Sequence, residues 1–139
     1  MPDPHDLDRF VVAQADSYPQ ALAELRRGRK ATHWMWYIFP QIAGLGQSAM
    51  ARRYAIADAD EARAYLAHPL LGKRLIEATE AVTAAPGGSA EAIMGGIDAI
   101  KLRSSLTLFA AVADDPAVFE VALARFFAGE RDPETLRRL

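Results

Sequence analysis

The chain contains no cysteine among its 139 residues. This absence excludes disulfide bonds, thiol nucleophiles and metal sites built on thiolates. It also agrees with a reducing compartment, where disulfides do not stabilise proteins. We therefore expect a cytoplasmic protein whose fold depends on packing and hydrogen bonds alone.

Long apolar runs and an excess of basic charge are also missing. No apolar stretch approaches the roughly 20 residues of a membrane-spanning helix, and the opening Met-Pro-Asp-Pro-His-Asp has no apolar signal region. The formal net charge is −2, so the chain lacks the general positive charge that a nucleic-acid backbone attracts. We expect neither a membrane nor a nucleic acid as a partner.

The patterns of metal sites and serine hydrolases are absent as well. The three histidines share no ligand spacing, and the chain has no His-Glu-x-x-His motif or Asp-rich calcium loop. It also has no Gly-x-Ser-x-Gly turn to carry a nucleophilic serine. We predict no metal site and no cofactor.

Helix caps and prolines are what the chain does contain. Asp6 is a plausible first cap, and Ser17-Tyr-Pro-Gln20 matches a capping box that would start a second helix, ended by Gly28. Later helices are expected to begin near Ser48, Asp60, Pro69, Ser89, Asp98, Asp115 and Asp132. With no convincing strands, the sequence predicts one compact all-α domain over residues 1–139, made of about six to eight short helices.

The most unusual stretch runs from Lys30 to Ser48. It concentrates both tryptophans, a tyrosine and a phenylalanine between positions 34 and 39, with His33 before them and Gln41 after. Seven residues are too few for periodicity to separate a strand from a buried helix, and we favour an irregular or helical buried segment. Such aromatic surface beside an imidazole and an amide is typical of a ligand pocket, and equally of a core with a polar rim.

Lys101 lies in an unexpected place on the helix expected from Asp98. At about 100° per residue, Lys101 and Ser105 fall between two apolar arcs of that helix rather than on its solvent side. The first turn of a helix also disfavours a cation. Two interpretations remain open: Lys101 and Ser105 meet an anionic ligand, or the stem of Lys101 packs while its ammonium pairs with Asp98 or another carboxylate.

Two motifs resemble those of a known family. They are His33-Trp-Met-Trp-Tyr-Ile-Phe-Pro-Gln41 followed by Gly44-Leu-Gly-Gln-Ser48, and Lys101-Leu-Arg-Ser-Ser-Leu-Thr-Leu-Phe109. Together with shorter matches between Tyr54 and Gly72, they resemble the bacterial domain-of-unknown-function family 1810, whose members sometimes carry the label calpastatin. The resemblance implies a helical domain. More distantly, the chain is similar to a helical superfamily of NAD and ADP-ribose metabolism, some members of which cleave N-glycosidic bonds.

Two functional hypotheses follow. In the first, the protein binds or hydrolyses a small anionic, nucleotide-derived ligand resembling ADP-ribose in an aromatic pocket. Its candidate catalytic residues are His33 and Glu61, and its candidate binding residues are Lys30, Trp34, Trp36, Gln41, Ser48, Lys101 and Ser105. In the second, it is a non-enzymatic helical module that docks a protein partner on an exposed tryptophan-rich surface. The first hypothesis also predicts that Lys101 approaches His33, with Asp98, Glu61 or a ligand as the anion between them.

Overall fold

Helices make up nearly all the regular structure of residues 3–139, the part of the chain that the computed structural model describes. The first two residues of the expected domain lie outside it. The nine helices of the described residues are α1 (Asp8–Arg27), α2 (Met35–Ile38), α3 (Ala49–Arg53), α4 (Ala59–Ala67), α5 (Leu71–Ala84), α6 (Ala90–Met94), α7 (Gly96–Val112), α8 (Ala117–Phe127) and α9 (Pro133–Arg137). The all-α prediction is confirmed. The count of nine is higher than the predicted six to eight because it includes four helices of a single turn, namely α2, α3, α6 and α9.

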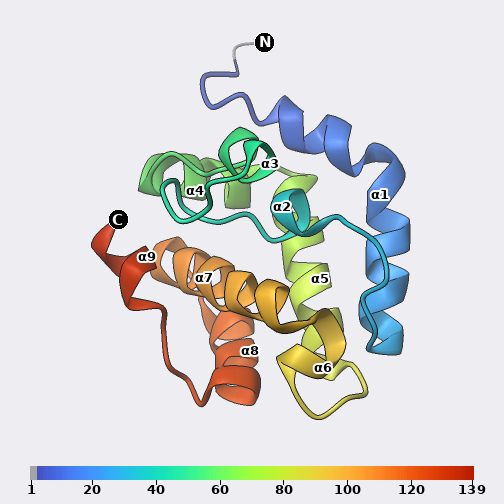
Figure 1. The fold of residues 1–139 in the computed structure, drawn as a ribbon. Helices are drawn as coiled ribbons and strands as arrows, with labels where there is room; N and C mark the ends of the chain where they lie inside the picture. Colours follow the sequence, from blue (N-terminus) through green and yellow to red (C-terminus); the bar gives the residue numbers. More distant parts are fainter. Residues whose placement is uncertain (1–2) are drawn as a thin grey trace.

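The helix α7 is the centre of the arrangement. It packs against α4, α6, α8 and α9, while α5 joins α1, α4 and α8 behind it (Figure 1). A row of aromatic rings crosses the core. The distances between ring centres are 5.1 Å for Phe10 and Tyr65, 5.4 Å for Tyr65 and Phe109, and 6.1 Å for Phe109 and Phe119. These rings connect α1, α4, α7 and α8 in one core. No helix within residues 3–139 is both long and apolar enough to cross a membrane.

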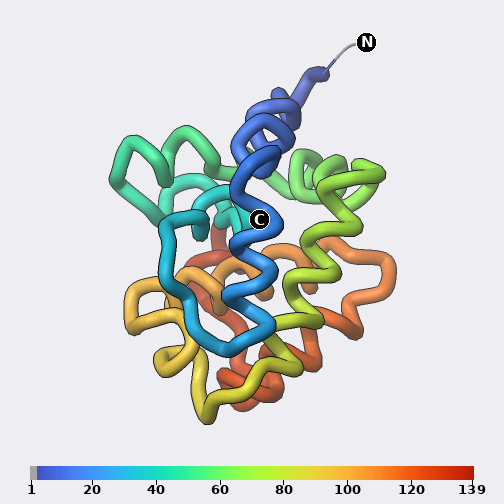
Figure 2. Tube along the Cα trace, turned by 90° about the vertical axis from the view of Figure 1, so that its right-hand side faces the viewer, coloured from blue at the N-terminus to red at the C-terminus, as the bar shows by residue number. Residues whose placement is uncertain are grey.

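The helix α1 differs from the expectation of two short helices. It is continuous through Pro19, and the Ser17 hydroxyl donates to the Ala13 carbonyl at 3.0 Å instead of capping a new helix. Proline removes only its own backbone bond to the preceding turn, and α1 bends midway along its length (Figures 1 and 2). The side chains of Tyr18 and Leu22 are buried on either side of this position, so tertiary packing keeps the helix together.

Three of the expected caps are present. Ser48, Ser89 and Asp132 accept hydrogen bonds from backbone amides three residues on, at 3.1, 3.1 and 3.3 Å. Each satisfies a donor that the first turn of a helix leaves free.

Three other expected caps are wrong. At α1, the carboxylate of Asp3 rather than Asp6 accepts from the first amides, those of Leu7 and Asp8. At α4 the cap is Asp58, which accepts from the Glu61 amide at 2.9 Å, rather than Asp60. Asp98 lies inside the first turn of α7 because that helix already begins at Gly96. Its carboxylate instead faces the ammonium groups of Lys30 and Lys101.

The aromatic stretch forms one helical turn, α2, followed by extended chain. Ile42 forms an isolated parallel bridge with Ile56, in which the Ile56 amide donates to the Gln41 carbonyl at 2.9 Å and the Ala43 amide donates to the Ile56 carbonyl at 2.8 Å. Between these points the chain forms an excursion that carries α3 (Figure 2). None of the side chains of α3 is buried.

Candidate functional site

Glu24, near the end of α1, organises the chain that follows it. The carboxylate is fully buried and accepts five hydrogen bonds from groups of four residues. Oε1 accepts from the amides of Ala31 and Thr32 at 2.7 and 3.0 Å and from the Trp34 indole at 2.9 Å. Oε2 accepts from the Thr32 hydroxyl at 2.6 Å and from the Gln20 amide group at 2.9 Å. Glu24 therefore fixes both the turn and the ring of Trp34.

The charge of Glu24 is stabilised by these donors. Burial alone raises the pKa of a carboxyl group, but the Thr32 hydroxyl and the amides of Ala31 and Thr32 favour the ionised form. The net effect holds the pKa of Glu24 well below its usual range. The carboxylate is thus a permanent negative charge beneath the aromatic stretch.

Asp98 stands between two lysines. Its Oδ2 lies 3.0 Å from the Lys30 ammonium, and its Oδ1 lies 3.9 Å from the Lys101 ammonium. The exposed fractions of the Lys30, Asp98 and Lys101 side chains are 7, 19 and 23%. Lys30 also donates to the Thr32 carbonyl at 2.6 Å. Lys30 is therefore held closely, whereas Lys101 makes a longer and more exposed contact.

Each lysine lies over the face of one tryptophan. The ammonium of Lys30 is 4.9 Å from the ring centre of Trp34, and that of Lys101 is 5.4 Å from the ring centre of Trp36. Both distances are within the range of cation–π attraction. Trp34 is only 1% exposed, while Trp36 keeps part of its surface accessible. Only the Lys101–Trp36 pair therefore offers an indole that a molecule from solvent can contact.

Two buried polar atoms beside this pair have no hydrogen-bond partner within the described residues. They are Nε1 of Trp36 and Oγ of Ser105, and Ser105 is 1% exposed. Ser105 follows Lys101 by one turn, on the same side of α7. Buried polar groups are nearly always paired, and leaving one unpaired costs about 1–3 kcal/mol. An unpaired donor and an unpaired hydroxyl near one ammonium therefore require an explanation.

Three further candidates remain: His33, predicted to be catalytic, and Gln41 and Ser48, predicted to bind. Within the described residues, none of them forms a hydrogen bond or ion pair with Trp36, Lys101 or Ser105. His33 is exposed, and its carbonyl accepts from the Tyr37 hydroxyl at 3.3 Å. The carbonyl of Gln41 accepts at the Ile56 bridge, and Ser48 is the exposed cap of α3. Within the described residues, no hydrogen bond or ion pair connects His33 with Lys101. The anion next to Lys101 is Asp98.

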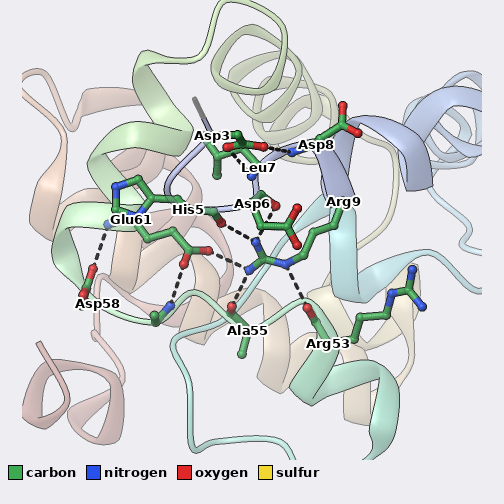
Figure 3. Close-up of polar contacts among 11 residues, drawn as sticks. Asp3, His5, Asp6, Leu7, Asp8, Arg9, Arg53, Ala55, Asp58 and Glu61 are labelled. Carbon is green, nitrogen blue, oxygen red and sulfur yellow. Dashed lines mark hydrogen bonds and ion pairs between the residues drawn. The ribbon is translucent and has the colours of Figure 1, made fainter. Parts of the chain in front are cut away.

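Glu61, the other candidate catalytic residue, belongs to a cluster around Arg9 (Figure 3). Glu61 is 4% exposed and accepts from the Arg9 guanidinium at 2.7 Å and from the Ala57 amide at 3.3 Å. The same guanidinium donates to the carbonyls of His5, Asp6, Arg53 and Ala55. Arg9 and Glu24 are separated along α1 by about 22 Å at 1.5 Å per residue. No hydrogen bond or ion pair within residues 3–139 connects the Glu61 cluster with Lys101.

The expected aromatic pocket does not correspond to any of four surface hollows found among residues 3–139. The largest, about 510 Å³, lies between α5 and α8 and is lined by Glu80, Thr83, Ala84, Ala117, Val118 and Val121. The other three lie beside α1 and α5, α4 and α7, and the start of α1. The same part of the chain holds no group of three or more His, Asp or Glu side chains placed to bind a metal ion.

Sequence reasoning missed the two residues with the most polar contacts, Glu24 and Arg9. Glu24 lies beside the buried Leu25 on α1, and a carboxylate within an apolar stripe was an available signal. For Arg9 no local pattern indicates its partners, because Ala55 and Glu61 are 46 and 52 residues away.

Comparison with known families accounts for the two motifs. The family model described as "Protein of unknown function (DUF1810)" matches residues 4–139. The chain belongs to this family. The DUF1810 chain is similar to the conserved hypothetical protein Rv1873 from Mycobacterium tuberculosis, whose crystal structure was solved at 1.38 Å. The two sequences are 50% identical, and the two structures superpose with a TM-score of 0.96. The match covers 99% of this chain and 98% of Rv1873. No curated protein matches the chain.

Proposed function

We propose that this DUF1810 protein binds a small anionic, nucleotide-derived ligand at the surface formed by Trp36 and Lys101, one turn of α7 before the buried Ser105. The observation that supports this proposal is the presence of two unpaired buried polar atoms beside a partly exposed ammonium. In this proposal, movement of the Lys101 side chain opens these atoms to an oxygen of the ligand.

The balance of donors and acceptors favours an anion. An ammonium has three donors and an indole has one, so Lys101 and Trp36 supply four. The nearest carboxylate, Asp98, lies 3.9 Å from Lys101, beyond hydrogen-bond distance, and is already paired with Lys30. An oxyanion can accept from both donors and from the Ser105 hydroxyl.

The accessible part of Trp36 favours a planar group next to that oxyanion. Indole rings stack on flat aromatic ligands, and a nucleobase is such a group. Access requires movement of the Lys101 side chain, which lies over the ring and has a flexible four-carbon stem. The binding site is therefore shallow, with Lys101 as its movable cover.

The proposal is for binding rather than hydrolysis. Acid–base catalysis needs a carboxyl group or an imidazole within reach of the substrate. Glu61 is paired with Arg9 in another region, and both oxygens of Glu24 are occupied. His33 is exposed and forms no side-chain hydrogen bond within the described residues. Among the described residues, the carboxylate beside Lys101 is that of Asp98, and it is paired with Lys30.

The alternative of a protein-interaction module has less support. Its tryptophan-rich surface is reduced to part of Trp36, because Trp34 is buried. Ile97 and Ile100 are 74 and 70% exposed on α7, but two exposed aliphatic side chains are ordinary for a protein surface.

Thermal unfolding in the presence of adenine nucleotides and ADP-ribose tests the proposal. A ligand at one hundred times its Kd adds about 2.7 kcal/mol to the free energy of unfolding, and at this chain length the midpoint then rises by about 9 °C. Lys101→Met should remove the increase, while Lys73→Met should keep it, because Lys73 is exposed on α5. A shift that survives in Lys101→Met, or no shift with any of these compounds, would contradict the proposal.

A further inference from the structure

The charges around Lys101 restrict the ligand further, in an argument that rests on the proposed function. We infer that the group bound at Lys101 is a singly charged oxyanion of the phosphodiester type, and not a terminal phosphate monoester. Cyclic nucleotides carry such a group. A terminal phosphate carries about −1.5 to −2 charges at pH 7, with a second pKa near 6.

The site offers one net positive charge. Lys30 and Lys101 contribute two positive charges and Asp98 contributes one negative charge. Lys30 is committed, because it lies 3.0 Å from Asp98, donates to Thr32 and is 7% exposed. A single negative charge on the ligand therefore makes the site neutral.

Among the described residues, a second negative charge on the ligand has no further buried cation beside Lys101 to meet. It approaches Asp98, whose Oδ1 lies 3.9 Å from the Lys101 ammonium. Like charges in a partly buried site disfavour one another strongly. The other basic residues close in sequence to these lysines or to Trp36 include Arg29, His33 and Arg103. Arg29 and His33 are exposed, so water and salt screen their contribution, and Arg103 donates to the carbonyls of Glu130 and Arg131.

Four adenosine compounds that differ in charge allow the inference to be tested through the ratio of their dissociation constants. Cyclic AMP has one negative charge, AMP has a titrating terminal phosphate, adenosine-5′-carboxylate has one charge without phosphorus, and adenosine has none. If only singly charged AMP binds, AMP should bind about 30-fold more weakly than cyclic AMP at pH 7.5, and within about twofold at pH 5.5. Because both ligands meet the same protein at each pH, any change in the protein that affects both ligands equally cancels in the ratio.

Isothermal titration calorimetry with these four compounds tests the inference. Adenosine-5′-carboxylate should bind about as tightly as cyclic AMP, and adenosine should bind most weakly. Lys101→Met should reduce the affinity for cyclic AMP to that for adenosine, whereas Lys73→Met should leave the affinity for cyclic AMP unchanged. Asp98→Asn adds one net positive charge, so the ratio of AMP to cyclic AMP dissociation constants at pH 7.5 should fall to a few-fold.

The outcomes separate the inference from the proposed function. AMP binding as tightly as cyclic AMP at pH 7.5, or an unchanged ratio in Asp98→Asn, overturns the inference while ligand binding stands. Carboxylate binding as weak as that of AMP also overturns it, because phosphate oxygens rather than charge would then decide affinity. If none of the four compounds binds, or if adenosine binds as well as cyclic AMP, the proposed function itself fails and the inference fails with it.

Discussion

Replacing Glu24 by glutamine keeps the shape of the side chain but removes its negative charge. The glutamine oxygen can still accept from the three donors that Oε1 serves, the amides of Ala31 and Thr32 and the indole of Trp34. Its NH₂ group then faces the Thr32 hydroxyl and the Gln20 amide group. The hydroxyl can rotate to accept, and the exposed Gln20 can turn away. The change therefore tests charge more than shape.

The expected loss follows from the five hydrogen bonds. Bonds to a charged group contribute about 1.5–3 kcal/mol each, against about 1 kcal/mol for neutral pairs. Part of that difference is offset because a neutral amide is easier to bury than a carboxylate. We expect Glu24→Gln to lower the free energy of unfolding by about 2–4 kcal/mol, which for a chain of this length lowers the midpoint by about 7–14 °C.

The dependence on pH provides a second signature. The pKa of Glu24 is lower in the folded protein than its ordinary value of 4.5. Its stabilising contribution is therefore complete above that value and is lost as the pH falls toward the folded pKa. Glutamine does not titrate. The difference between wild type and Glu24→Gln should thus be largest at neutral pH and shrink steadily below pH 4.5.

Urea unfolding followed by circular dichroism between pH 3 and pH 7 measures both effects. Glu80→Gln is the matched control, because Glu80 is exposed on α5, and surface substitutions usually change stability by less than about 0.5 kcal/mol. If Glu24→Gln and Glu80→Gln are equally stable at pH 7, the charge of Glu24 does not support the turn and the reasoning is refuted.

Two further predictions concern other contacts. Arg9→Met should lower the free energy of unfolding in urea by about 3–5 kcal/mol because it leaves Glu61 buried and unpaired; adding Glu61→Gln should recover part of the loss, and no recovery would show that the ion pair is not the cause. Gly28→Ala should lose about 2–4 kcal/mol by thermal unfolding, since its φ is 77° and a new Cβ would lie 2.1 Å from the Pro86 carbonyl oxygen. Gly129→Ala has the same φ but open space around it, so it should lose only about 1–2 kcal/mol, and equal losses would contradict the steric argument.

Local signals predicted the helices well where the signal and its partner are close in sequence. Ser48, Ser89 and Asp132 cap helices because the amides they accept from lie three residues on. Pro19 misled the prediction because burial of its neighbours, rather than local preference, decides that α1 continues. Asp98 misled it because the carboxylate pairs with Lys30, which is far away along the chain.

The candidate site shows the same limit. The sequence singled out Trp36 and Lys101 separately, from aromatic clustering and from a charge between two apolar arcs of a helix. The fold places the Lys101 ammonium 5.4 Å from the ring centre of Trp36. The sequence could not separate Trp36 from Trp34, because burial of Trp34 depends on the carboxylate of Glu24, which comes from another helix. The pairing of Glu61 with Arg9 likewise depends on how α1 and α4 meet.

The segment between Ala43 and Arg52 is joined to the core at its two ends, by the Ile42–Ile56 bridge and by the hydrogen bond from Arg9 to the Arg53 carbonyl. Between these ends, the partly buried Leu45 also packs against the core. Because α3 buries none of its side chains, this segment can open and close as a unit with a free energy far below that of global unfolding. The other eight helices of residues 3–139 and the surface around Lys101 can therefore keep their arrangement while this segment opens.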